Sequence, residues 1–293
     1  MLLQACACPA TAGQEDPLPK VLHVAFSLRV FPDVDQRDAK IAMELWAREL
    51  SRKAGIPQAQ VILFDNPGEI EGMVRSGKIH LVTLPPLDYL AWHQRLNIEP
   101  AYVAANKSGR NMEYVLIVRR DSGITHVRNL KGKTVAISKA INARTGSLWF
   151  TVLLMREGIH NYRDFSEKPM EETKPSQTVM GVFFRQYQAA VVTRGSLETS
   201  FAVNPQLNKE LVILAQSRSL VGDLSCLPAT VGKRMKKAMD DAAMTLHETA
   251  VGKQMTTLFH IDRVIPFSPS HMAGVEALLK DREMLKKTRG KQR

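Results

Sequence analysis

The sequence predicts an α/β protein with mainly parallel sheets, and it is long enough for two domains. Short hydrophobic runs typical of strands alternate with helix-like runs along almost all of the 293 residues. A chain of this length can form two domains of ordinary size or one large domain. In parallel sheets, ligands bind beyond the carboxyl ends of the strands, so loops at those ends are the first candidates for a functional site.

The elements follow from hydrophobic periodicity and from helix-stopping residues. Between residues 38 and 52, for example, Ile41, Leu45 and Leu50 share one helical face, and Gly55 ends the helix. Strands are expected at 21–27, 61–65, 79–84, 101–105, 113–119, 135–137, 189–193 and 211–215. Helices are expected at 38–52, 148–157, 178–185, 229–250 and 271–285, with short helices near Glu69 and Leu87.

The segment from residue 130 to residue 157 is the most informative part of the chain. Gly132 supplies a turn, and residues 135–137 form a short strand buried on both faces. Thr145 and Ser147 are both suitable N-caps for the apolar helix that follows. A strand that leads into such a helix start leaves backbone N–H groups facing a crevice, which favours an anion. The alternative is an ordinary capped helix.

Composition and charge limit the classes of partner. Hydrophobic content of 44% with 24% charged residues is typical of a soluble globular protein, and no run approaches the roughly 18–20 apolar residues of a membrane span. The net charge is +11, and the last 14 residues contribute +5 of it, with seven Lys/Arg against two Asp/Glu. We expect this end to be solvated or disordered. The sequence has no stripe of basic residues interleaved with stacking aromatics, so nothing in it indicates nucleic-acid binding. The positive charge of the rest of the chain instead favours attraction of small anions.

The first residues differ in composition from the rest. The segment 1–13 is rich in Ala, Cys, Pro and Thr; residues 10–12 form an A-x-A cleavage pattern, and Cys6 or Cys8 could belong to a degraded lipobox. A charged start and a long apolar stretch are missing. Residues 1–19 are therefore either the remnant of an export signal that begins upstream or an unstructured leader. Cys226 then stands alone, so no internal disulfide is expected.

Familiar catalytic and metal-binding motifs are missing from the sequence. There is no G-x-G-x-x-G or G-x-S-x-G, and Gly132-Lys133-Thr134 lacks the upstream glycine of a P-loop. His247-Glu248 has no second histidine four residues on, and the eight histidines are scattered. We therefore predict no catalytic residues, no cofactor and no metal site.

Four segments in order resemble one family. They are residues 82–89 (VTLPPLDY), 113–124 (EYVLIVRRDSGI), 130–146 (LKGKTVAISKAINARTG) and 182–194 (VFFRQYQAAVVTR). Together they resemble the phosphate, phosphite and phosphonate substrate-binding proteins of ABC transporters, which have the type II periplasmic-binding-protein fold. The resemblance runs from about residue 21 to residue 279. It implies two α/β lobes with a ligand cleft between them, closing like a clamp.

The resemblance also implies an organisation and a role. Residues 20–112 with 216–293 would form lobe one, and residues 113–215 lobe two; the strand 113–119 and the stretch 213–219 would be the hinge. The protein would bind a small phosphate- or phosphonate-like anion, without catalysis, for an ABC permease and ATPase. It would act as a monomer in the periplasm, or lipid-anchored at the outer face of a membrane.

Candidate ligand contacts are carried over position by position. Where the family has Ser-Thr-Ser-Gly, this chain has Ala143, Arg144, Thr145 and Gly146, so one hydroxyl is lost and a guanidinium that can hold an oxyanion appears. Arg144 could equally be an exposed loop residue. Gln188 occupies the position of an amine-binding Asp, which argues against a ligand with a cationic end. The remaining candidates, some of which could have packing roles, are Ser147, Ser27, Arg29, Phe31, Tyr89, Ser176, Gln177 and Arg194.

Two other functions remain open from the sequence. The same two-lobed fold occurs in biosynthetic enzymes of the cytoplasm, and fold alone does not separate an enzyme from a binding protein. A third alternative is a ligand-sensing subunit that reports to a signalling partner.

Overall fold

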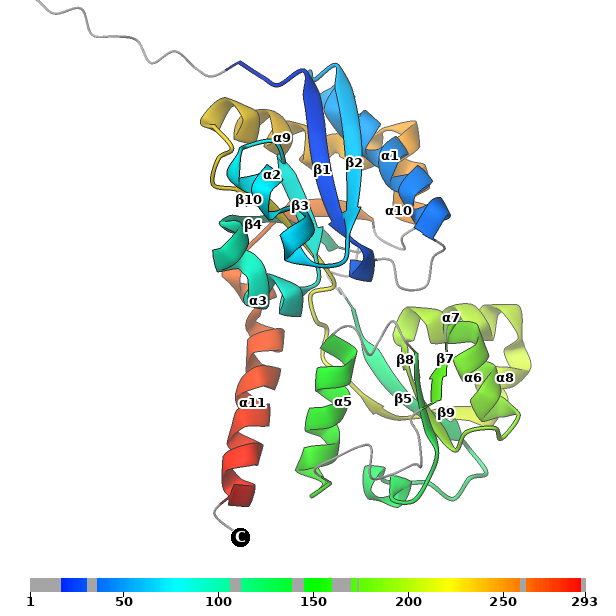
Figure 1. The fold of residues 1–293 in the computed structure, drawn as a ribbon. Helices are drawn as coiled ribbons and strands as arrows, with labels where there is room; N and C mark the ends of the chain where they lie inside the picture. The colour runs from blue at the N-terminus through cyan, green and yellow to red at the C-terminus, as the bar shows by residue number, and fades with distance from the viewer. Residues whose placement is uncertain are drawn as a thin grey trace, which may run out of the picture.

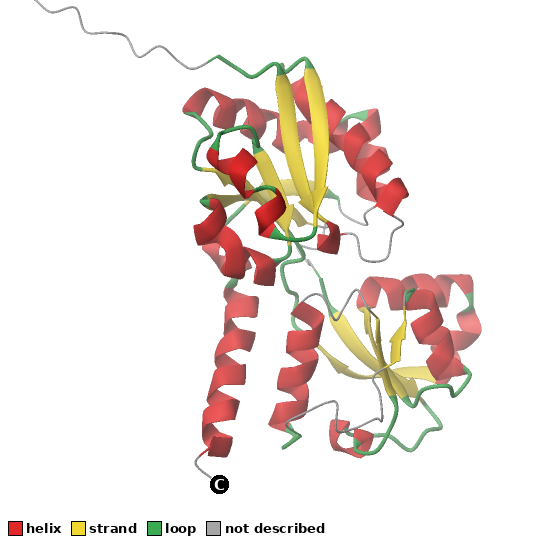
Figure 2. Ribbon diagram, viewed as in Figure 1, coloured by secondary structure: helices red, strands yellow, loops and turns green. Residues whose placement is uncertain are grey.

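Two separate β-sheets, each flanked by helices, divide the protein into two lobes (Figures 1 and 2). The computed structural model describes residues 17–30, 36–105, 112–138, 145–159, 170–172, 174–258 and 262–290. The predicted leader lies mostly outside these ranges. The expected two-lobed α/β architecture is confirmed, with one correction: both sheets are mixed, because the strands near the crossings between the lobes run antiparallel to their neighbours.

In the residues that the structure describes, the sheet of lobe one has six strands. β1 is parallel to both β2 and β3, whereas β10 runs antiparallel between β3 and β4, and β11 is antiparallel to β4. Four of these strands were expected from the sequence, but β10 and β11 were not. In sheet order the strands are β11 (Arg263–Pro266), β4 (Ile98–Ala105), β10 (Leu224–Pro228), β3 (Leu81–Leu84), β1 (Val21–Ser27) and β2 (Gln58–Phe64).

Helices cover the sheet of lobe one on both faces (Figure 1). One apolar cluster joins α1 (Gln36–Lys53) to α9 (Lys233–Thr245), and α10 (Ala250–Leu258) lies beside α1. The other cluster involves α2 (Glu71–Arg75), α3 (Pro86–Leu96) and the residues that lead into the last helix. The single helix expected at 229–250 is wrong: a 3-10 turn, η5 (Leu246–Glu248), separates α9 from α10.

The described part of lobe two is built on five strands. The strands β6, β7 and β8 are parallel, and β5 is antiparallel to its neighbours β8 and β9. Gly132 has φ +74, which confirms the turn expected before β6. The elements are β5 (Tyr114–Arg119), β6 (Val135–Ser138), β7 (Met170–Glu172), β8 (Ala189–Thr193), β9 (Leu211–Gln216), α5 (Thr145–Arg156), α6 (Pro175–Phe183), α7 (Arg194–Val203), α8 (Pro205–Glu210) and the 3-10 turn η3 (Val127–Leu130).

The two chain segments that cross between the lobes pair with each other. Met112 and Leu220 exchange both backbone hydrogen bonds, with N···O distances of 2.7 and 2.9 Å. Next to them, Tyr114 N donates to Ser217 Oγ, and Ser217 N donates to Tyr114 O, each over 2.8 Å. The strands expected to form the hinge are thus β5 and β9 of the lobe-two sheet, and the crossing itself continues past them to the Met112–Leu220 bridge.

The last helix, α11 (Ala273–Gly290), runs from lobe one along lobe two (Figure 1). The sequence placed residues 216–293 with lobe one, but Leu278 is buried in the lobe-two cluster and α11 packs on α5. Arg156 of α5 and Asp281 of α11 form an ion pair. Of the two alternatives given for the end from residue 280, disorder is wrong as far as Gly290, because the helix continues to that residue, whereas most of the described side chains there are exposed, as expected of a solvated end.

Two histidines link β1 to the start of β3. His23 N donates to His80 Nδ1 over 3.0 Å, His80 N donates to His23 O over 2.9 Å, and the two rings stack with centroids 5.8 Å apart. Burial, and then the neighbouring His23, hold the pKa of His80 below its ordinary value of 6.5. The unfolded chain therefore binds a proton at this position more readily than the folded protein.

We predict that the free energy of unfolding falls as the pH drops below about 6.5, because protons then favour the unfolded state. In the variant His80→Asn, the amide oxygen still accepts the hydrogen bond from His23 N, so this loss should be smaller. Urea unfolding of both proteins between about pH 7.5 and 5.5 measures how far the free energy of unfolding falls. His271→Asn, which removes another Nδ1 acceptor of a backbone N–H, is the matched control. An unchanged pH slope in His80→Asn would contradict the prediction.

Candidate functional site

Three helices of lobe two begin at one edge of its sheet. β7, β6 and β8 are adjacent and parallel, so their carboxyl ends lie at the same edge. α5, α6 and α7 each follow one of these strands along the chain. The beginning of α5 and helix α7 lie on the side of lobe two that faces lobe one (Figure 1). This edge therefore gathers three helix N-termini opposite the other lobe.

The first turns of these three helices suit an anion. None of them contains an acidic residue. The N-cap residue of α6, Lys174, makes no capping hydrogen bond through its side chain, whereas Thr193 of α7 accepts one from Ser196 N over 3.2 Å. Unpaired N–H groups and the positive end of the helix dipole both favour negative charge at such positions.

The predicted contacts on lobe two fall at two of these helix starts. Thr145 and Gly146 are buried in the first turn of α5, and Ser147 is half-buried. Ser176 and Gln177 are exposed in the first turn of α6. The topology thus brings these five residues to one edge of the sheet. Arg144, the proposed replacement for a lost hydroxyl, lies outside the described residues.

Arg194 begins α7, but its guanidinium is directed to the crossing between the lobes. Its Nε donates to Glu113 Oε2 over 2.9 Å, and it also hydrogen-bonds to Gln216 Oε1. Gln216 Nε2 donates to the same Glu113 oxygen over 2.8 Å. Arg194 therefore ties the ends of β5 and β9 together. The sequence did not point to Glu113 or Gln216, because the network depends on antiparallel pairing between strands distant in sequence.

On lobe one, Ser27 is the last residue of β1 and Arg29 follows the strand. Ser27 is fully buried, and its Oγ accepts a hydrogen bond from Arg29 N over 3.3 Å. The Arg29 guanidinium pairs with Asp88 at 3.0 Å and with Asp65 at 3.5 Å. It also lies over the ring of Trp92, 5.4 Å from the centroid. Phe31, the other candidate in this loop, lies outside the described residues.

The two carboxylates around Arg29 differ in exposure. The Asp88 side chain is 11% exposed in the first turn of α3, and the Asp65 side chain directly after β2 is 65% exposed. These aspartates were missed as partners of Arg29. Their positions just after two parallel strands were the available signal, because such residues share one sheet edge.

Tyr89 has the packing role that the sequence left open, and Gln188 occupies different surroundings from those expected. Tyr89 packs against the lobe-one core with its ring 4.8 Å from that of His93, and burial raises its pKa. Gln188 precedes β8, and its Oε1 accepts a hydrogen bond from Thr134 N over 2.7 Å. That is the amino end of β8, opposite to Arg194. We therefore leave Gln188 out of the site, together with the preference for an amine-free ligand inferred from it.

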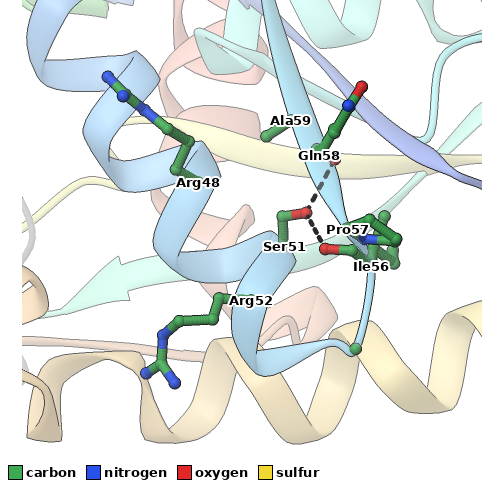
Figure 3. Close-up of a pocket in the computed structure, with 8 residues that line it drawn as sticks. Arg48, Ser51, Arg52, Ile56, Pro57, Gln58 and Ala59 are labelled. Carbon is green, nitrogen blue, oxygen red and sulfur yellow. Dashed lines mark hydrogen bonds between the residues drawn. The ribbon is translucent and has the colours of Figure 1, made fainter.

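A pocket of about 590 Å³ lies elsewhere, on lobe one (Figure 3). It is formed where α1 ends and β2 begins, which is the amino end of that strand. Ser51 is buried there and donates to the carbonyl oxygens of Ile56 and Gln58 over 2.7 and 2.9 Å. Arg52 beside it pairs with Glu49. Ser51 and Arg52 are thus occupied by partners of the fold, and none of the predicted contacts lines this pocket.

Metal ligands and membrane helices were searched in the described ranges. No group of three or more His, Cys, Asp or Glu side chains there is placed to hold a metal ion. None of the helices in the same ranges combines the length and apolar composition of a membrane span.

Several solved structures share this fold. The chain is similar to a binding protein component of a phosphonate ABC transporter from Pseudomonas aeruginosa, with 13% identity, a TM-score of 0.67 and coverage of 91% of this chain and 87% of that one. PhnD1 of Prochlorococcus marinus in complex with methylphosphonate is 17% identical, with a TM-score of 0.66 and coverage of 89% of this chain and 97% of that one. The aliphatic sulphonate-binding protein SsuA of Escherichia coli is 13% identical, with a TM-score of 0.54 and coverage of 93% of this chain and 88% of that one. At these identities the likeness establishes the type II periplasmic-binding-protein fold.

The family follows from the sequence as a whole. No curated protein matches the chain. A family model described as "ABC transporter, phosphonate, periplasmic substrate-binding protein" matches residues 28–272, which is most of its length. The chain belongs to the family of periplasmic substrate-binding proteins of phosphonate ABC transporters.

Proposed function

We propose that the protein captures a phosphonate or a closely related small oxyanion between its lobes, with the head group at the N-termini of α5, α6 and α7. Members of the family bind a small anionic ligand and work with the permease and ATPase of an ABC transporter, typically in the periplasm. The observation that carries the proposal is the convergence of three acid-free helix starts on one sheet edge that faces lobe one. Such starts hold oxyanions through backbone N–H groups.

The roles of the individual groups follow from their positions. Thr145 and Ser147 add hydroxyl donors at the start of α5, and Arg144 adds a charged donor directly before it. Arg29 is the proposed contribution of lobe one, held in place by Asp88. Arg194 has a positioning role, because it joins the two strands that lead to the crossing.

The proposal extends to the finer points of the assignment. The protein releases its ligand unchanged, acts as a monomer and is located in the periplasm, either free or lipid-anchored. The methylphosphonate in the Prochlorococcus marinus structure and the sulphonate specificity of SsuA supply the first probes. A thermal-shift screen of methylphosphonate, phosphate, phosphite, sulfate and alkyl sulphonates tests the ligand class. A ligand at 100 times its dissociation constant adds about 2.7 kcal/mol of stability.

We predict that Thr145→Val weakens binding of methylphosphonate by about tenfold or more, because a hydrogen bond to a charged group is lost. Arg144→Ala should have an effect of the same order. Isothermal titration calorimetry measures both. The matched control is Thr151→Val on the same helix, since the Thr151 hydroxyl donates to Ser147 O over 2.8 Å and is used within α5. Equal affinities of Thr145→Val and the wild type would remove this hydroxyl from the site.

Charge changes on lobe one should act in opposite directions. Arg29→Gln removes the cation and leaves Asp65 and Asp88 to repel an anion, so affinity for methylphosphonate should fall by about tenfold. Asp65→Asn removes one exposed negative charge and should raise the affinity by about twofold, with both effects smaller at high salt. Titration calorimetry at two ionic strengths separates these effects. If neither change alters binding, lobe one does not contact the anion through Arg29.

A further inference from the structure

The helix α11 is anchored to lobe one and to the crossing between the lobes. Met272, just before the helix, and Val275 in its first turn are buried in a cluster of lobe one. Between them, Gly274 lies directly against the crossing: a Cβ atom added there would lie 2.7 Å from Leu220 Cδ2. The absence of a side chain at Gly274 therefore allows the start of α11 to approach the segment that connects the lobes.

The later turns of α11 belong to the other lobe. Leu278 is buried in the lobe-two cluster, and Leu285, two turns on, packs against it. Asp281 pairs with Arg156 near the end of α5. In the described part of the chain, α11 packs on α5 more extensively than any other pair of helices or strands drawn from different lobes.

We infer that α11 sets the angle between the lobes and that its contact with α5 opposes closure. The lobes are joined covalently by two segments, which permit rotation about the Met112–Leu220 bridge. Rotation must shift α11 along α5, because one end of α11 is held by lobe one. The link to ligand binding rests on the proposed function, since α5 begins at the proposed anion site.

A contact that favours the open arrangement lowers the apparent affinity, because the closed, binding-competent state is less populated. Residues far from the ligand can then tune affinity. Leu278, Leu285 and the Arg156–Asp281 pair lie along α11 and α5, on the length of these helices that leads away from the start of α5. Weakening these contacts should release the lobes without altering a ligand contact.

The experiment measures the distance between lobes in the ligand-free protein. Spin labels are placed at exposed positions on each lobe with Arg48→Cys and Ala202→Cys, in a background in which Cys6 and Cys8 are Ser; Cys226 is buried and stays unlabelled. Asp281→Arg and, separately, Leu285→Ser should broaden the distance distribution and shift it to shorter distances. Combining Arg156→Asp with Asp281→Arg should restore it, because the pair is reformed with reversed charges.

Calorimetry with methylphosphonate gives a second readout. Asp281→Arg should bind about two- to fivefold more tightly than the wild type, as expected for losing one weak contact that opposes closure. Glu276→Arg is the matched control, since it changes the charge of α11 equally at an exposed position.

The outcomes are distinct. Unchanged distance distributions in both Asp281→Arg and Leu285→Ser would overturn the inference, and so would weaker binding in Asp281→Arg with Glu276→Arg unchanged. If methylphosphonate binds to no variant and not to the wild type, the proposed function fails. The spin-label distances still decide the role of α11 in that case.

Discussion

The antiparallel pairing of the two crossing segments is the constraint on which the arrangement of the lobes depends. Met112 and Leu220 exchange both of their backbone hydrogen bonds, and Tyr114 and Ser217 add two more. Backbone pairing of this kind resists shear but permits twist and bending. Arg194 reinforces the lobe-two side of the crossing through Glu113 and Gln216. The helix starts of lobe two are therefore held at a defined position relative to the point about which the lobes turn.

Electrostatics distinguishes the two facing edges. The lobe-two edge uses neutral backbone donors at helix starts without acidic residues. On lobe one, Arg29 lies between Asp65 and Asp88, so its charge is more than balanced by its immediate neighbours. Under the proposed function, the head group of a ligand would find most of its attraction on lobe two. Lobe one would then contribute orientation and the sensitivity to salt expected of partly exposed charges.

The sequence predicted the elements with strong local signals and missed those defined by distant partners. The strand 21–27 and the helix after Thr145 were found because periodicity and caps mark them locally. The strand β10 was missed, because its five residues end in Pro228 and gain their identity from β3 and β4 on either side. The continuous helix expected over 229–250 is interrupted by the 3-10 turn η5, and the chain folds back so tightly there that a Cβ atom added at Gly252 would lie 1.8 Å from the carbonyl oxygen of Leu246.

The candidate site residues also divide into those with a local signal in the sequence and those whose surroundings depend on distant partners. Thr145 could be placed from the strand–loop–helix pattern, whereas Ser176 was placed from the resemblance, since the strand β7 before it was not predicted. The environment of Gln188 could not, because the resemblance gave its position along the chain but not the end of β8 at which it lies. The aspartates that pair with Arg29 were visible as residues following strands, yet the pairing itself required the order of strands in the sheet.

The position of β10 has a consequence for the order in which the protein folds. Lobe two takes the five strands described for it from one continuous length of chain, from Tyr114 to Gln216. Lobe one needs β10 between β3 and β4, so its sheet stays divided until residues beyond 224 have emerged from the ribosome or the translocation channel. Contacts between distant segments form slowly, because the loop between them must be closed first. Lobe two can therefore fold first and serve as a template. Lobe one, in which the chain begins, can complete its sheet only after the later part of the chain has been synthesised.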